Sequence, residues 1–456
     1  MKPHSSSPVE SLGSLIRWCP PCFPLSQCRR GEGFVCVDVG LTSLARCPRD
    51  TPAFFCPLGK VFAMTKTSKI LALCALVSLA VAGCSSSSSD SNAAATPALT
   101  GTVRIGVEAP ISGDQAETGK GMINGAQLAA DQLNAKGGIN GKKVVIVPID
   151  DAADAVVGVK AATAAIKAGL DGVVGPYNSG AGAKTLPLYI KAGLTPIRLT
   201  SNSTTTNGLG YTLQPMDYQI VPVATDAVTK WLKAKTAVLV FDSTPGYTAT
   251  IDAKLKASLE KAGVTVKANV GITPGAKSYA SQVKAAAALN PDVVYLVMYS
   301  PEAGSIAKTM YDTKVPAKCV ADYAADDPIF VTTAGIPAAK ACPVIGVPSP
   351  SEFPNGPEFV SQYKAAFGEE PGTWSPYTFD SLNLLAKAAE DTGGFNAKKL
   401  KANLDAVKGW EGVTGSVTID AANGNRDPAT LVVLDVTEAG ELQIDKAWSK
   451  AVGADY

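Results

Sequence analysis

Short apolar runs alternate with helical patterns along the chain from residue 101 onward. The run at 103–107 is typical of a buried strand, and after it apolar residues recur every three to four positions from Met122 to Leu133. Gly137 and Gly138 then end this first predicted helix. Later predicted strands cover 144–147, 172–175, 196–199, 237–241, 264–270, 293–298 and 318–321, and later helices 155–168, 182–192, 248–262, 278–289 and 302–313.

This alternation predicts parallel sheets that are covered by helices on both faces. The stretch from residue 101 to the end is longer than one hydrophobic core usually supports. We therefore expect an α/β fold of two doubly wound parallel-sheet lobes. In such sheets ligands bind at the carboxyl ends of the strands, so the cleft between the lobes is the expected site.

An uncharged apolar stretch at 70–82 follows Lys66 and Lys69, as in a secretory signal peptide. It is too short for a transmembrane helix, which needs about 20 residues. The stretch ends at Gly83 and Cys84 in a sequence that resembles the bacterial lipoprotein box, in which the signal is cut before a lipidated cysteine. We interpret 64–83 as a lipoprotein signal peptide; an ordinary exported protein with a chance cysteine is the alternative.

Residues 1–63 precede this signal, although a signal should open the chain. They hold six of the ten cysteines and the only histidine, His4. We interpret them as an upstream extension that is not part of the translated protein, with Met64 as the true start. The alternative is a small metal-binding or disulfide-bonded module around Cys19 and Cys22, although the second ligand pair of a zinc site is missing.

The residues at 84–100 are rich in serine and lack large apolar side chains, so they cannot offset the cost of ordering them. We expect a tether that holds the folded body away from a membrane to which only the lipid on Cys84 binds. The predicted location is the outer face of the bacterial cytoplasmic membrane, on its periplasmic or extracellular side.

Charge and cysteine content narrow the possible partners. Beyond residue 83 the chain has 32 Lys and Arg against 36 Asp and Glu, a net charge of −4, which argues against a nucleic-acid partner. Only Cys319 and Cys342 remain in the predicted folded body. In an oxidising compartment we expect them to form a disulfide; two unpaired buried cysteines are the alternative.

The usual parts of an enzyme are missing from the predicted body. It has no histidine, which excludes Ser-His-Asp and Cys-His catalysis and removes the commonest zinc ligand. The segment SGAGAKT at 179–185 lacks the glycine that directly precedes lysine in a phosphate-binding loop. We therefore predict a protein that is not an enzyme and has no cofactor and no metal.

Two polar loops follow consecutive predicted strands and lead into helix starts, at 176–180 and 200–206. Free N–H groups at a helix N-terminus, together with Ser and Thr hydroxyls, can bind a carboxylate. Each residue could instead serve as a helix cap or turn.

Four stretches of the chain resemble the leucine/isoleucine/valine-binding proteins, type I periplasmic solute-binding components of ABC importers. The stretches are VRIGVEAPISG at 103–113, LNAKGGINGKKVVIVPIDDAAD at 133–154, VVGPYNSG at 173–180 and VVYLVMYSPEAGSIAKTM at 293–310.

The resemblance implies roles for individual residues. Ser179, with backbone help near Tyr177, would bind the ligand carboxylate, and Asn202, Ser203 and Thr204 would form the second loop of the same lobe. The second lobe would add the residues Tyr247, Tyr299 and Asp322, of which the two tyrosines line the cleft and the aspartate holds the ligand ammonium.

Two positions depart from the family. Thr118 stands where the family often has an aromatic residue, and the paired cysteines of the family's first lobe are absent, with Ala153 near one of them. The resemblance itself implies an amino acid, of the branched-chain type first, as the small-molecule ligand. An amide, urea or an aromatic acid is the alternative.

The resemblance also implies a division of the chain and a mechanism. The first lobe would comprise 101–220 and 347–427, the second 221–346 and 428–456, with crossovers near 220, 346 and 428. Ligand contacts from both lobes would favour hinge closure, and the closed monomer would deliver its ligand to a membrane permease. A sensor that presents its ligand to a receptor, or an exported enzyme, remains the alternative.

Overall fold

The computed structural model describes residues 99–452, which form two seven-stranded sheets and their covering helices. The predicted extension at 1–63, the signal at 64–83, the anchor Cys84 and all but the last two residues of the tether lie outside the described residues. No helix in the part of the chain that is described is long and apolar enough to span a membrane.

The first lobe is built on the sheet whose strands run in the order β13-β14-β5-β4-β3-β1-β2. All neighbouring pairs are parallel except β13 and β14. The strands are β1 (Thr102–Ala109), β2 (Lys143–Asp150), β3 (Gly172–Val174), β4 (Pro196–Arg198), β5 (Tyr211–Thr212), β13 (Ile419–Asp420) and β14 (Asn425–Arg426).

The second lobe repeats this plan with the order β16-β15-β10-β9-β8-β6-β7. Here β15 is antiparallel to both of its neighbours, β10 and β16. The strands are β6 (Thr236–Asp242), β7 (Thr265–Ile272), β8 (Val293–Val297), β9 (Lys318–Ala321), β10 (Val344–Gly346), β15 (Val432–Val436) and β16 (Leu442–Ile444); β11 (Trp410–Gly412) and β12 (Gly415–Val417) form a separate hairpin.

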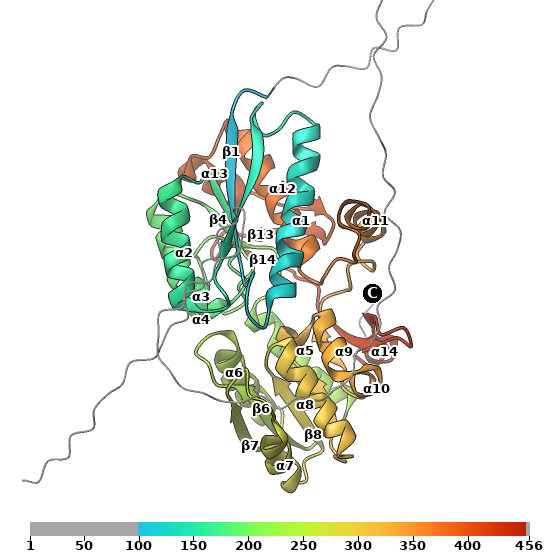
Figure 1. Cartoon of the computed structure of the whole chain (residues 1–456). Coiled ribbons are helices and arrows are strands. Elements are labelled where there is room, and N and C mark those ends of the chain that lie inside the picture. The colour runs from blue at the N-terminus through green and yellow to red at the C-terminus, as the bar shows by residue number, and fades with distance from the viewer. Residues whose placement is uncertain (1–98, 453–456) are drawn as a thin grey trace, which may run out of the picture. The chain divides into compact units, whose positions relative to one another are not determined.

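Helices lie on both faces of the first sheet: α2 and α3 on one face, α1 and α12 on the other (Figure 1). The helices of the first lobe and its connections are α1 (Ala116–Ala135), α2 (Ala155–Ala168), α3 (Ser179–Lys191), α4 (Ser203–Thr206), α5 (Asp217–Asp226), α11 (Gly356–Phe367), α12 (Ser375–Thr392) and α13 (Ala397–Asp405). Those of the second lobe are α6 (Tyr247–Lys261), α7 (Ala280–Ala288), α8 (Ser300–Asp312), α9 (Pro328–Ala334), α10 (Ile336–Lys340) and α14 (Lys446–Val452).

The chain passes between the two sheets three times: between β5 and β6, after β10, and between β14 and β15. Each lobe is therefore made of segments that are distant in sequence. The predicted fold class, two doubly wound α/β lobes with three crossovers, is confirmed.

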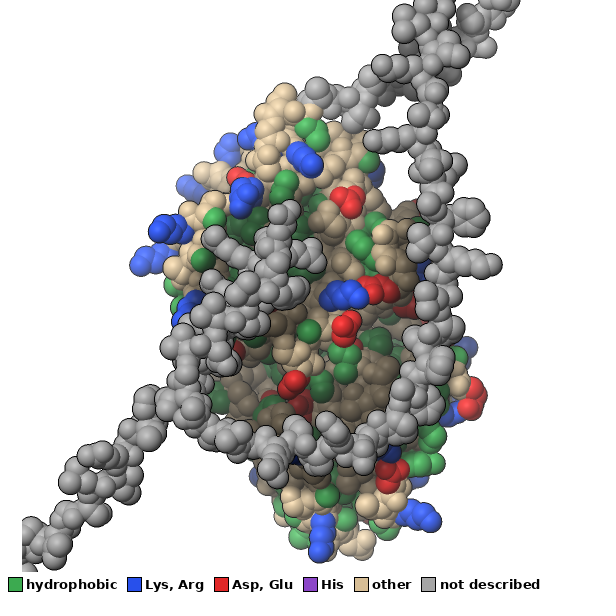
Figure 2. Space-filling view, in the orientation of Figure 1, with side chains coloured by type: hydrophobic (Ala, Val, Ile, Leu, Met, Phe, Trp, Pro, Cys, Tyr) green, Lys and Arg blue, Asp and Glu red, His purple; other side chains and the backbone are tan. Residues whose placement is uncertain are grey.

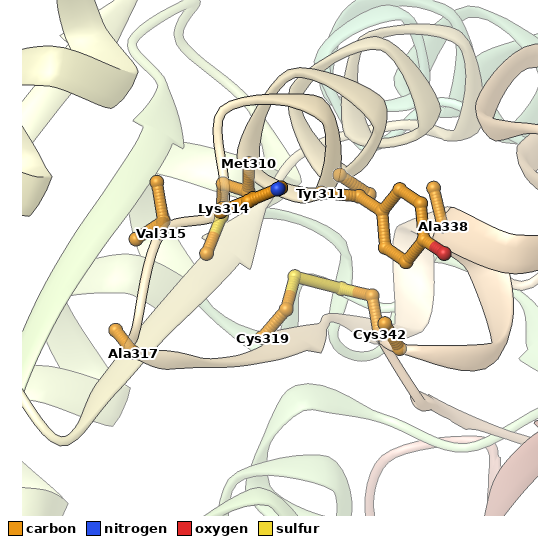
Figure 3. A pocket seen from close by; sticks show the side chains of 10 residues that line it. Met310, Tyr311, Lys314, Val315, Ala317, Cys319, Ala338 and Cys342 are labelled. Carbon is orange, nitrogen blue, oxygen red and sulfur yellow. A yellow bond between two sulfur atoms is a disulfide. The ribbon is translucent and has the colours of Figure 1, made fainter.

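Cys319 and Cys342 form a disulfide in the second lobe, as the sequence analysis expects. Figure 3 shows the disulfide at the floor of a groove beside Tyr311 and Lys314. Cys319 is the second residue of β9, and Cys342 lies two residues before β10 begins. The bond therefore ties together the starts of two neighbouring strands.

Two carboxyl groups are buried together in the first lobe. Glu108 near the end of β1 and Asp151 directly after β2 are both fully buried, and Thr185 and Tyr189 of α3 face Glu108. Burial, and then the charge of Asp151, raises the pKa of Glu108 to about 8, although the nearby hydroxyls of Tyr189 and Thr185 lower it. Burial likewise raises the pKa of Asp151 to about 7. We therefore expect the stability of this lobe to fall as pH rises through the neutral range toward 8.

Glu108→Gln should reduce the loss of stability at alkaline pH. Between pH 5.5 and pH 8 the folded state keeps the Glu108 proton and the unfolded state releases it, so the free energy of unfolding falls as pH rises. Each pH unit in this window contributes about 1.4 kcal/mol per proton, so wild type should lose roughly 2–3 kcal/mol more than the variant.

Urea unfolding at the two pH values measures this difference. Glu117→Gln on α1 is the matched control, since the Glu117 side chain is 74% exposed. Equal pH dependence of wild type and Glu108→Gln would contradict the expectation.

Candidate functional site

The carboxyl ends of the central strands of both sheets lie at the boundary between the lobes. In each sheet the first strand lies between the second and the third, so the loops after β1 and β3, and after β6 and β8, diverge to opposite sides. This topological switch point is where open α/β sheets bind ligands. The sequence-predicted residues of both lobes follow these strands or their neighbours.

Residues of both lobes enclose a pocket at this boundary, here called the inner pocket. The free volume in it is about 10 Å³, roughly room for one water molecule, so the lobes must separate before an amino-acid-sized ligand can enter. The lining residues are Tyr177, Ser179, Leu199, Ser201 and Gln214 of the first lobe and Tyr247, Tyr299, Tyr323 and Ala324 of the second.

Ser179 is the first residue of α3 and is 1% exposed. No described side chain caps this helix, so its first N–H groups remain available at the pocket. The loop before it depends on Gly175, whose φ is 88° and whose missing Cβ would lie 2.1 Å from the carbonyl oxygen of Glu108. Only glycine fits this contact, which brings the start of α3 against the end of β1.

The predicted ammonium ligand Asp322 does not line the inner pocket. It is fully buried, and its two oxygens accept hydrogen bonds from the hydroxyls of Tyr247 at 3.0 Å and Tyr295 at 3.1 Å. Burial raises the pKa of Asp322 to about 6, and the two hydroxyls limit the shift. The hydroxyl of Tyr247 thus connects this carboxyl group to the pocket wall.

Three residues of the predicted second loop lie outside the pocket lining. The Asn202 side chain caps α4 by accepting a bond from the N–H of Thr204, which is otherwise exposed. Ser203 accepts a bond from Lys254 at 2.9 Å. Of the eight predicted binding residues, the structure therefore gathers Tyr177, Ser179, Tyr247 and Tyr299 around the pocket.

Three further lining residues, Ser201, Gln214 and Tyr323, were not predicted from the sequence. Ser201 directly precedes the predicted Asn202, and Tyr323 directly follows the predicted Asp322, so each loop was found but not the residue that faces the pocket. Gln214 follows β5, a strand of two residues that leaves no readable pattern. It donates hydrogen bonds to Ser201 at 2.9 Å and to the carbonyl of Leu199, and it accepts one from Tyr323 at 3.4 Å.

A larger opening, here called the outer cleft, adjoins the inner pocket at Tyr247 and Tyr299 and has a free volume of about 400 Å³. Figure 2 shows acidic side chains around the hollow on this face. The described residues that line the outer cleft include four carboxyl groups and neither Lys nor Arg; the acidic residues are Asp114, Asp154, Asp242 and Glu302. Cations are therefore favoured in the approach to the pocket.

Direct contacts join the lobes around the pocket. Thr118 of α1 donates a buried hydrogen bond to Asp327, the N-cap of α9, at 2.9 Å. Asn202 donates to the carbonyl of Gly246 and to Thr250, both at 2.9 Å. Thr118 thus binds the opposite lobe and does not line the inner pocket. Separation of the lobes would break all three bonds and leave their donors and acceptors to water.

The family model described as periplasmic binding protein matches residues 102–441, which is most of the chain. The chain belongs to the periplasmic binding protein family. Relatives of this periplasmic binding protein include the Leu/Ile/Val-binding protein homolog 2 of Brucella abortus, 27% identical over 324 residues, or 70% of this chain and 86% of the relative. An amino acid binding protein of Pseudomonas aeruginosa is 31% identical over 309 residues, which are 65% of this chain and 80% of the relative.

Solved structures show the same fold. The branched-chain amino acid transporter substrate binding protein LivJ of Streptococcus pneumoniae, solved with isoleucine, is 26% identical with a TM-score of 0.66 and covers 75% of this chain and 100% of its own. A solute binding protein of Rhodopseudomonas palustris, solved with 3,4-dihydroxy benzoic acid, is 19% identical with a TM-score of 0.67. The match covers 75% of this chain and 96% of that protein.

The comparisons confirm the resemblance to the Leu/Ile/Val-binding proteins. They also place the chain among proteins that bind small solutes outside the cytoplasm rather than among enzymes. In the part of the chain that is described, no group of three or more His, Cys, Asp or Glu residues could hold a metal.

Thr118→Val should shift this periplasmic binding protein toward the open arrangement. The variant keeps the shape of the side chain. In the closed arrangement it leaves one oxygen of the buried Asp327 without a donor, while the other oxygen still accepts a bond from the N–H of Ile329. A buried acceptor without its partner costs about 1–3 kcal/mol, so the closed form should lose 5- to 150-fold in population.

Small-angle X-ray scattering of the ligand-free protein measures this shift as a larger radius of gyration. Thr163→Val on α2 is the matched control, because the Thr163 hydroxyl bonds only the carbonyl of Val159 in its own helix. An unchanged radius for Thr118→Val would contradict a role of this bond in closure.

Proposed function

We propose that the chain is the extracytoplasmic solute-binding lipoprotein of an ABC importer. It binds an amino acid, of the branched-chain type first, in the inner pocket and delivers it as a closed monomer to a membrane permease. Cys84 carries the lipid that anchors it to the membrane. Relatives named Leu/Ile/Val-binding proteins and the LivJ structure with isoleucine support this class of ligand.

One observation carries the proposal. The buried start of α3, with Ser179 as its first residue, faces second-lobe tyrosines across a pocket that both lobes enclose. A helix N-terminus favours a carboxylate, and the Ser179 hydroxyl can donate to it. Since the ligand would touch both lobes only in the closed form, its binding energy would favour closure.

An aromatic acid is the second candidate. Four tyrosines line the inner pocket, and the Rhodopseudomonas palustris structure of the same fold contains 3,4-dihydroxy benzoic acid. Offset or edge-on contacts between rings would stabilise such a ligand. The acidic outer cleft opposes it, because an aromatic acid lacks the positive charge of an amino acid.

Thermal unfolding with the twenty amino acids, urea, short amides and benzoate tests both candidates. At 100 times its Kd a ligand adds about 2.7 kcal/mol to native stability, and we expect leucine, isoleucine or valine to do so. Ser179→Ala should weaken binding by about 10- to 150-fold, since a hydrogen bond to a charged group contributes about 1.5–3 kcal/mol.

Ser281→Ala on α7 is the control, because Ser281 is exposed and lies in a helix outside the pocket. A shift with benzoate alone would favour the aromatic acid. Binding unchanged in Ser179→Ala would refute the assignment of the carboxylate site.

A further inference from the structure

Four tyrosine rings line the inner pocket, and the ring of Trp374 packs against two of them. Tyr177 and Tyr299 have ring centroids 6.0 Å apart across the lobe boundary, and Tyr247 and Tyr323 are 6.3 Å apart in the second lobe. Trp374, at the start of α12, joins the two pairs at 5.3 Å from Tyr177 and 5.3 Å from Tyr323. Neighbouring rings are inclined by 47° to 65°, so they contact one another edge-on or tilted in the closed arrangement, and the Tyr177–Tyr299 contact must part when the lobes separate.

No Asp, Glu, Lys or Arg is among the described residues that line this pocket. In the second lobe, both oxygens of Asp322 accept hydrogen bonds from the hydroxyls of Tyr247 and Tyr295. Asp326, also buried, accepts a bond from the N–H of Val347. Acidic groups therefore lie behind the aromatic wall, but their oxygens are already bonded to the protein.

Of these two groups, Asp322 has a pKa raised to about 6 and so keeps its negative charge at neutral pH, whereas burial raises the pKa of Asp326 to about 8 and favours its neutral form. Burial, and then neighbouring groups that include Asp327 and Asp326, raises the pKa of Tyr177 well above its ordinary value. The outer cleft adds four more carboxyl groups along the route of entry. A positively charged group gains from the field of the ionised groups even without touching a carboxylate.

A primary ammonium carries three N–H donors, and each needs an acceptor when the ammonium leaves water. A methylated nitrogen has the same charge without those donors, and aromatic rings bind such cations through their negatively charged faces. A pocket of rings without a free carboxylate therefore suits a methylated cation better than a bare ammonium.

We propose that the aromatic ring of the inner pocket binds the cationic nitrogen of the ligand and accepts N-methylation, so that the ligands include N-methylated amino acids of the betaine class. This inference rests on the proposed function, because the carboxylate of such a ligand is still expected at Ser179. It assigns Asp322 a positioning role through Tyr247 instead of a direct contact with the ligand.

Calorimetric titration with matched pairs tests the inference. The pairs are glycine and glycine betaine, proline and N,N-dimethylproline, and valine and N,N,N-trimethylvaline. We expect the methylated member of at least one pair to bind with an equal or lower Kd than its parent. A parent that binds while methylation weakens every pair more than tenfold would overturn the inference and leave the proposed function standing.

Variants of one ring give a second test. Tyr299→Leu should weaken binding of the methylated ligand by about 3- to 30-fold, whereas Tyr299→Phe should preserve it within about threefold, because phenylalanine keeps the ring. Tyr311→Leu on α8 is the control, since Tyr311 is 49% exposed and lies in the groove beside the disulfide.

Equal binding of the methylated ligand by wild type and Tyr299→Leu would also overturn the inference. Binding of benzoate, with no response to any amino acid or methylated amino acid, would refute the proposed amino-acid function and the inference together.

Discussion

The three chain crossings between the two sheets are the constraint on which the rest of the structure depends. Because each lobe is completed by segments that follow the other lobe in sequence, three backbone connections keep the two sheets together. In the closed arrangement hydrogen bonds such as that from Thr118 to Asp327 also join the lobes. The strand ends of both lobes are thereby held face to face. Every residue of the inner pocket owes its place to this arrangement, since five come from one lobe and four from the other.

Several acidic groups are buried at this boundary, and their burial costs free energy. Asp322, Asp326 and Asp327 are each at most 5% exposed, and burial raises the pKa of every one of them. Their partners are hydroxyls and backbone N–H groups instead of cations. Such groups stabilise the fold less than apolar residues would, and buried carboxyl groups with raised pKa values are typical of functional sites.

The sequence predicted the regular core well because strands with two buried faces leave long apolar runs. The predicted strand at 237–241 and the helix at 155–168 correspond closely to β6 and α2. Beyond residue 321 no strand or helix was predicted. β14 has two residues, too few to show a period, but α12 has 18 residues and was missed although its length could show one. The run of polar residues located the loop after β4. Which of Ser201 or Asn202 faces the pocket depends on the direction of the backbone, which the residue pattern does not record.

The disulfide at the groove has a consequence for how the protein moves. Cys342 is only four residues from Gly346, the end of the strand after which the chain leaves the second lobe. Since Cys319 fixes that exit segment to β9, the strand cannot peel away from its sheet when the lobes separate. At this crossing, any bending is therefore confined to the residues after Gly346, so that β10 moves together with β9 as part of the second lobe.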